Sequence, residues 1–299
     1  MREHVLDIYE DNQPRTDTSQ KCFRFARDLF DNFGPHEPPV DLRAYHEPCK
    51  VEGDVEFGDL VGHGCLYWAA DRQKFRVKVN QRLPRTFGRF VWAHELAHAI
   101  QIFSLNDFSV PEAGPLKRKL SVDACSKEEF LCDAVASELL IPRKLFDPMV
   151  DARDAGIKAI LELSKRFDVP VTTAARRYVR SVAEKCLLIF WDVASLNPIT
   201  LRPRVNRYSR SFPRRAKVSE FVGDSNQPAS ALISGKLRRG PEWIDLGLGK
   251  ECVYIESIPC RLRNRNAILS LLILDRDSHS SPERYPPDEL QRTFGFPAS

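Results

Sequence analysis

The stretch that decides the fold is residues 89–103, which read RFVWAHELAHAIQIF. It contains neither glycine nor proline, and its alanine and leucine residues favour helix. Phe90, Ala93, Ala97 and Ile100 recur at three- and four-residue steps, so one face of this helix is apolar. Because most of the remaining positions are also apolar, we expect the helix to be buried.

Within this helix, His94, Glu95 and His98 form the pattern H-E-x-x-H. Residues four apart lie one above the other on a helix face, so two imidazole nitrogens can converge on one ion at the roughly 2.0–2.1 Å that zinc requires. Glu95 projects from the same turn and can take a proton from a water that the metal activates. The alternative is a pair of histidines satisfied by hydrogen bonds, but the helical context that the motif needs is present. The pattern therefore predicts a zinc hydrolase.

A catalytic zinc needs a third protein ligand and one open position. The extended motif with a downstream glycine and histidine is absent, since Gln101 and Ser104 occupy those places. A second helix is predicted over residues 126–141, with Ser126 as its N-cap and Glu129 completing a capping box. Glu129 is the best candidate for the third ligand, although an acid near a helix start can also serve the helix dipole alone.

Three further acids on the second helix enter the interpretation. Glu128 is the neighbouring alternative ligand, and Glu138 is a weaker one. Asp133 lies four residues after Glu129, on the same helix face. Since a ligating histidine usually donates its other N–H to a carboxylate, we expect Asp133 to hold His94 or His98.

Together these helices resemble the ImmA/IrrE family of bacterial metallo-endopeptidases. Arg89 and Phe90 precede the motif as in that family, and residues 129–142 follow approximately its pattern E-x-x-A-[ND]-x-F-A-x-x-L-L-x-P. Cys132 replaces the usual alanine and Val135 the usual phenylalanine. The matching positions are Glu129, Asp133, Ala136, Leu139, Leu140 and Pro142.

The resemblance covers roughly residues 51–182. Residues 58–62, the strand that ends at Asn80, and residues 163–169 are also similar to the family. The resemblance implies that Glu129 is the third ligand and that zinc is the cofactor, with manganese as the alternative. It also implies that the substrate is a protein, a DNA-binding repressor of the helix-turn-helix type, whose cleavage releases stress-response or mobile-element genes.

The patterns along the whole chain predict an α+β protein. Residues 75–79 alternate apolar with basic side chains, as in a strand with one buried face. Two helices, at 157–167 and 171–182, resemble a helix-turn-helix. The other predicted elements are a helix at 19–33 with an apolar stripe of Cys22, Ala26, Leu29 and Phe33, and strands at 187–193, 253–258 and 267–274.

We expect four parts along the chain. A metallopeptidase domain, with a small antiparallel sheet beside the H-E-x-x-H helix, spans residues 1–150. A helical extension follows over 151–185, then a β-rich C-terminal module over 186–277. The Ser/Pro-rich segment 278–299 is expected to be a flexible tail. The C-terminal module could serve as a sensor, a substrate-docking surface or a scaffold.

Basic side chains raise the possibility of direct contact with DNA. Arg176, Arg177 and Arg180 lie near the second helix of the pair, and residues 202–217 are rich in arginine without an acidic residue between them. Simple packing of the helix pair is favoured, because affinity for DNA needs a broader basic footprint. The arginine-rich stretch could supply one or be a solvated loop. The rival to an enzyme is therefore a DNA-binding or metal-sensing regulator with a non-catalytic metal site.

Bulk composition sets the remaining expectations. The chain has 299 residues, 42% hydrophobic content and a net charge of +4, which is typical of a globular protein. No apolar run is long enough for a membrane span, and we expect no signal peptide, because the first residues of the chain lack an apolar h-region. Its 8 cysteines are scattered without a C-x-x-C pair, which favours reduced thiols in the cytoplasm. Candidates for stabilising an oxyanion are His63, Tyr67 and Tyr178, with no basis for ranking them.

Overall fold

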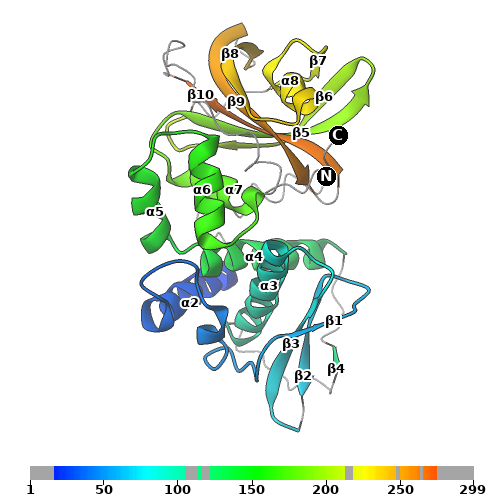
Figure 1. The fold of residues 1–299 in the computed structure, drawn as a ribbon. Coiled ribbons are helices and arrows are strands. Elements are labelled where there is room, and N and C mark those ends of the chain that lie inside the picture. The colour runs from blue at the N-terminus through cyan, green and yellow to red at the C-terminus, as the bar shows by residue number, and fades with distance from the viewer. Residues whose placement is uncertain are drawn as a thin grey trace. The chain divides into compact units, whose positions relative to one another are not determined.

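The computed structural model describes residues 17–69, 71–104, 114–115, 122–212, 218–246, 250–262 and 265–274 (Figure 1). The chain divides into two compact units. The first comprises residues 1–148 and 163–173, and the second comprises residues 149–162 and 174–299. The expectation of an α+β fold is confirmed, because helices and sheets occur in separate stretches of the chain.

The first unit contains a four-stranded sheet in the order β1-β3-β2-β4. Its strands are β1 (Glu56–Gly58), β2 (Gly64–Ala69), β3 (Lys74–Asn80) and β4 (Gly114–Pro115). β2 pairs antiparallel with β3 and β4, but β1 runs parallel to β3, so the sheet is mixed rather than wholly antiparallel. β1 and β2 flank β3 on opposite sides.

Burial in β3 follows the period that the sequence predicts. Phe75, Val77 and Val79 are buried, while the basic residues between them are partly exposed. Asn80 ends the strand, and its side-chain amide donates to the carbonyl oxygens of Leu60 and Gly62 at 2.9 and 3.0 Å. This amide therefore fixes the loop that leads from β1 into β2.

Four helical segments complete most of the first unit: α2 (Asp17–Phe33), the 3-10 helix η1 (Leu42–Tyr45), α3 (Arg85–Ser104) and α4 (Val122–Leu140). α3 packs against α2 and α4 on one side and against β2 and β3 on another. The expected burial of α3 is confirmed, since Ala93, Leu96, Ala97 and Ile100 are all buried. In α2 the stripe holds for Cys22, Ala26 and Leu29, whereas Phe33 at the helix end is 51% exposed.

The start of α4 differs from the sequence prediction. The helix begins at Val122, so Ser126 lies inside it and the predicted N-cap and capping box are wrong. Residues 122–125 contain neither glycine nor proline, so nothing in them stops the helix from extending towards its N-terminus. As a result, Glu129 lies in the second turn of α4 and not at its start.

The turn between α6 (Ile157–Phe167) and α7 (Val171–Ser181) belongs to the first unit and is tied to α3. Asp168 in this turn has a φ of 53°, in the left-handed region. Its carboxylate accepts from Arg85 at 2.9 Å, and its carbonyl oxygen accepts from Arg89 at 3.1 Å. Arg89 also donates to the carbonyl oxygen of Val40 at 2.8 Å. Arg89 therefore anchors the helix that carries the histidines. α5 (Arg143–Asp151) crosses the boundary between the two units.

The second unit contains an antiparallel six-stranded sheet in the order β7-β6-β5-β10-β9-β8. One face packs against α8 (Gln227–Ser234) around a buried cluster that includes Trp191, Ile255 and Ile268. The strands are β5 (Cys186–Leu196), β6 (Ile199–Tyr208), β7 (Phe221–Val222), β8 (Arg238–Asp245), β9 (Lys250–Leu262) and β10 (Arg265–Ile273). The predicted strands are thus present, and the predicted tail lies outside the described residues.

The first part of the arginine-rich stretch is a strand and not a solvated loop. Arg202 and Arg204 lie on β6 and pair with acidic residues distant in sequence, Arg202 with Glu220 and Arg204 with Asp192, both at 3.1 Å. On α7, Arg177 is only 5% exposed. Burial favours a packing role for Arg204 and Arg177, whereas the Arg202 side chain is 68% exposed and its pair with Glu220 lies at the surface. Residues 213–217 lie outside the described part of the chain.

Among the described residues, no helix has both the length and the apolar character needed to cross a membrane.

Candidate metal centre

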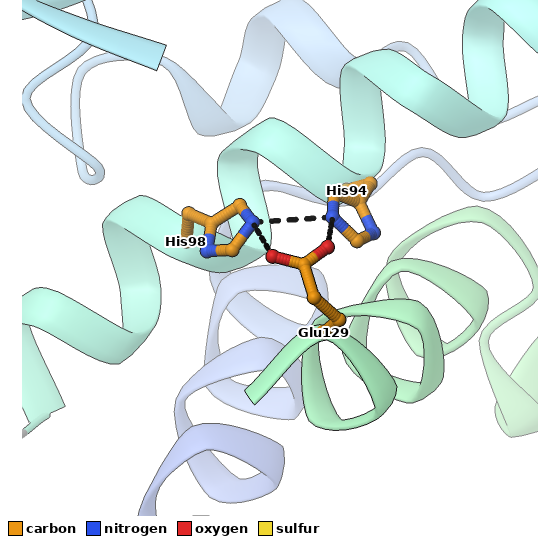
Figure 2. A group of neighbouring side chains, drawn as sticks. All are labelled: His94, His98 and Glu129. Atoms are coloured by element: carbon orange, nitrogen blue, oxygen red, sulfur yellow. Dashed lines mark hydrogen bonds and ion pairs between the residues drawn. The ribbon is translucent and has the colours of Figure 1, made fainter. Parts of the chain in front are cut away.

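The two motif histidines meet on one face of α3, as their spacing predicts. Their Nε2 atoms lie 3.1 Å apart, and the rings meet edge to face (Figure 2). Both side chains are mostly buried, with 13% and 20% exposed. Two imidazole nitrogens that point at one spot from one helix provide half of a tetrahedral metal site.

Glu129 supplies a third ligand atom from α4. Its carboxylate lies between the two rings, with Oε2 3.2 Å from His94 Nε2 and Oε1 3.5 Å from His98 Nε2 (Figure 2). One potential ligand atom from each of His94, His98 and Glu129 lies within 4.8 Å of the others. We call these three residues the His-His-Glu group, which is able to hold a metal ion.

The alternative ligands lie differently. Glu128 approaches His98 on its other nitrogen, Nδ1, at 3.7 Å, on the side opposite Glu129. Glu138 is buried and forms an ion pair with Arg27 at 3.8 Å. Neither belongs to the group of converging ligand atoms found among the described residues.

Asp133 supports His94, one of the two histidines that the sequence prediction named. Its Oδ1 lies 2.8 Å from His94 Nδ1, so the ring can donate an N–H to the carboxylate and leave Nε2 free to face a metal. Burial lowers the pKa of His94, but hydrogen bonds to Asp133 and Glu129 outweigh it and raise that pKa to about 10. Two imidazole nitrogens and a carboxylate oxygen within 4.8 Å of one another are a donor set that a divalent metal takes, so the residues present fit such an ion.

Glu95, the predicted base, is held against β2. The side chain is 7% exposed, and its carboxylate accepts a hydrogen bond from the backbone of Leu66. Burial raises the pKa of Glu95, while the two histidines oppose this shift. A carboxylate with a raised pKa is better matched to accepting and returning a proton near neutral pH.

Gly64 makes room for this carboxylate. A Cβ atom at position 64 would lie 2.9 Å from Glu95 Oε1 and 2.5 Å from Val91 Cγ1. Real Cβ atoms do not approach that closely to other atoms, so only glycine fits between β2 and α3 here. Sequence reasoning missed Gly64, although a glycine at the start of a strand is a recognised sign of a close approach.

The described contacts of the three candidates for oxyanion stabilisation are with residues outside the His-His-Glu group. The Tyr67 hydroxyl donates to Glu56 at 2.7 Å, and the exposed His63 ring packs against Phe87. Tyr178 belongs to the second unit, where its hydroxyl accepts from the backbone N–H of Gly156. No contact described for these residues assigns the role to one of them.

Cys132 and Gln101 are two neighbours of the centre that sequence reasoning did not assign. The Cys132 thiol lies 3.3 Å from His98 Nδ1 and donates to Gln101 Oε1 at 3.5 Å. Burial raises the pKa of this thiol well above its usual value. The spacing offered a signal, because Cys132 lies three residues after Glu129 and Gln101 three residues after His98, each one helical turn on.

This geometry defines a class of protein: an α+β protein with an H-E-x-x-H helix, a His-His-Glu group that could hold a metal ion, and a buried glutamate beside it. Residues 67–178 match the Peptidase_M78 family model, described as the IrrE N-terminal-like domain. The match confirms the family resemblance over these residues, which are similar to the IrrE N-terminal-like domain of the Peptidase_M78 family. The matched residues include β3 and the two helices that carry the His-His-Glu group.

The chain is also similar in fold to a solved structure. A structure named "Mycobacterium tuberculosis transcriptional regulator" has a TM-score of 0.59 and 15% sequence identity, and the alignment covers 91% of this chain and 81% of that one. At that identity the similarity is one of fold. No curated protein matches the chain.

Proposed function

We propose that the protein is a zinc-dependent endopeptidase in which His94, His98 and Glu129 hold the ion and Glu95 is the catalytic base. The observation that carries the proposal is the convergence of three ligand atoms from two helices next to a buried glutamate. Two histidines and a glutamate are a ligand set that zinc uses in peptidases, and it leaves one coordination position open. The family match supports peptidase chemistry at the level of the family.

In the proposed reaction, a bound zinc ion would supply Lewis-acid polarisation of the scissile carbonyl and of the attacking water. Glu95 would take the proton of that water and deliver it to the leaving amine nitrogen. The Leu66 backbone would orient the Glu95 carboxylate, and Asp133 would orient His94. These contacts support the proposal, because side chains that are oriented before substrate binds would need little reorganisation during the reaction.

The substitution Glu95→Gln tests this mechanism. We expect cleavage to fall by roughly 100- to 10,000-fold, the usual contribution of a general base. Zinc content should stay at the wild-type level, because Glu95 is not among the proposed ligands. The measurement is zinc content by mass spectrometry together with cleavage of a candidate substrate. Glu52→Gln, the same change at a glutamate paired with Arg76, is the matched control and should retain full activity.

For the substrate we propose a helix-turn-helix transcriptional repressor, cleaved in the cytoplasm during a stress or mobile-element response. The family resemblance supports this substrate, and the scattered cysteines support the compartment. The structurally similar protein named a transcriptional regulator is compatible with such a setting. Co-expression with repressors encoded beside the gene should give one defined cut with the wild type and none with Glu95→Gln. A regulatory effect that Glu95→Gln leaves intact would instead support a metal-sensing regulator with a non-catalytic site.

Two further assignments belong to the proposal. We propose zinc over manganese as the resident metal, because two imidazoles and one carboxylate suit zinc. Metal analysis of protein purified without added metal tests this choice. We also keep the four parts 1–150, 151–185, 186–277 and 278–299 as proposed functional domains, with peptidase chemistry in the first.

A further inference from the structure

The two histidines of the His-His-Glu group are supported unequally on their outer nitrogens. His94 Nδ1 lies 2.8 Å from a carboxylate oxygen of Asp133. His98 Nδ1 lies 3.3 Å from the thiol sulfur of Cys132. A metal-bound histidine usually donates its outer N–H to a carboxylate, a backbone carbonyl or water, so a thiol in this place is a departure from the common arrangement.

The surroundings of Cys132 make its thiol the nearest partner for His98 Nδ1. Cys132 is fully buried, and Glu128 stays 3.7 Å from the same nitrogen, beyond ordinary hydrogen-bond distance. The thiol hydrogen is directed to Gln101 Oε1 at 3.5 Å, which leaves the sulfur lone pairs for the imidazole N–H. Gln101 is itself only 7% exposed.

These contacts join α3 and α4 behind the proposed metal. Gln101 lies one turn after His98 on α3, and Cys132 lies one turn after Glu129 on α4. A path of contacts therefore runs from His98 to Cys132 and back to Gln101 on the helix that carries His98. This path restricts rotation of the imidazole and keeps its Nε2 directed at Glu129.

We propose that Cys132 is a positioning residue for His98: its thiol accepts the Nδ1–H of His98, fixes the tautomer, and so presents the Nε2 lone pair to the metal. The inference rests on the proposed function, since it assumes that His98 is a ligand. It concerns a position at which this chain departs from the family pattern, where the resemblance gives alanine. A neutral thiol is a weaker acceptor than a carboxylate, so His98 is the more loosely supported of the two histidine ligands.

The test compares the zinc affinities of three variants with that of the wild type, by competition with a chromophoric chelator. Cys132→Ala should weaken zinc binding by roughly 10- to 100-fold, the usual cost of losing a partner of a metal ligand. Cys132→Ser replaces the thiol with a hydroxyl, which can also accept and donate hydrogen bonds, so it should retain part of the zinc affinity that Cys132→Ala loses. Cys49→Ala removes another fully buried thiol of the same unit and should leave zinc affinity unchanged. The thermal stability of the metal-free proteins separates a packing defect from a loss of ligand positioning.

Two outcomes would overturn the inference. One is a Cys132→Ala variant that binds zinc as tightly as the wild type. The other is a thiolate-to-cobalt charge-transfer band in the cobalt-substituted wild type that Cys132→Ala removes, because Cys132 would then be a ligand. A wild type that binds no zinc at all would instead refute the proposed function, so the two failures are distinguishable.

Discussion

The two units use their polar side chains differently. In the first unit, His94, His98 and Glu129 turn their ligand atoms toward one another, with a buried Glu95 beside them. In the second unit, the buried carboxylate of Glu256 accepts from the backbone N–H of Ile157 at 2.7 Å, and its charge supports the start of α6. The difference teaches that burial of a charged group does not by itself indicate chemistry. What indicates chemistry is several ligand atoms that converge on one point.

The largest expected effect concerns Gly64, which lies against Glu95. The substitution Gly64→Ala would place a methyl group against Glu95 and Val91 and shift the proposed base. We expect cleavage to fall by about 100-fold, the cost of a misplacement of roughly 1 Å, with zinc affinity unchanged. Gly62→Ala is the matched control, because a Cβ at that position meets nothing within 4 Å. Equal activities of the two variants would show that Gly64 does not position Glu95.

A second prediction concerns Glu256. Glu256→Gln keeps the shape but removes the charge at the N-terminus of α6, and should cost about 1 to 2 kcal/mol in the free energy of unfolding. Zinc affinity should not change. Urea unfolding followed by circular dichroism measures the first effect and chelator competition the second. Glu251→Gln, at an exposed position of the same strand, should leave stability unchanged. A loss of zinc binding in Glu256→Gln would break the contrast between the units.

A third prediction is a pH effect in the scaffold beneath the site. His46 Nδ1 donates to the Gly53 carbonyl at 2.8 Å, and Nε2 accepts from Trp92 Nε1 at 3.1 Å. Both ring nitrogens of the neutral imidazole therefore have a hydrogen-bond partner. Burial lowers the pKa of His46, although the hydrogen bond to the Gly53 carbonyl and the charges of Asp54 and Asp41 oppose this shift. Because the folded pKa lies below the unfolded value, this stability is complete above the unfolded pKa of about 6.5. It is lost as the pH falls through the folded pKa.

The size of this effect is about 1 kcal/mol, the worth of the Trp92 hydrogen bond. Urea midpoints of the wild type and His46→Phe, measured from pH 8 down to pH 5, should converge as the pH falls. Subtracting the His46→Phe midpoint from the wild-type midpoint at each pH removes the contribution of the other histidines in the unit. A gap between the two midpoints that stays constant with pH would contradict the assignment.

Sequence patterns with local causes predicted the first unit well. The period of three and four residues placed α3, the alternation in residues 75–79 placed β3, and the spacing of four placed His94 and His98 together. Asp133 was predicted as a histidine partner because it lies one turn after Glu129. Each of these features depends on residues that are close in the sequence and share one face of one element.

Features with distant causes could not be predicted in the same way. The parallel pairing of β1 with β3 depends on the path of the chain between the two strands, which no local sequence pattern predicts. In the sequence, Arg204 lies in a run of basic residues without an acidic one, because its acidic partner Asp192 lies on another strand. The capping-box signal at Ser126 is a local pattern, but α4 begins four residues earlier, and residues 122–125 contain no glycine or proline that would stop it.

The contact between Cys132 and His98 joins two helices, so it also needed the fold. A single sequence could show that Cys132 departs from the family pattern, but not that its sulfur faces an imidazole. The same holds for Gly64, whose neighbour Glu95 lies on a different element. Cys132 and Gly64 both lie at the proposed metal centre, where the arrangement of functional side chains overrides local sequence preferences.

The most direct test of the account is zinc binding by the metal-stripped protein, measured by isothermal titration calorimetry on the wild type, His94→Ala and Glu129→Ala. The account predicts one zinc ion per chain in the wild type, loss of that binding in His94→Ala, and clearly weaker binding in Glu129→Ala. Unchanged zinc affinity in Glu129→Ala, or a wild type that binds no zinc, would contradict it.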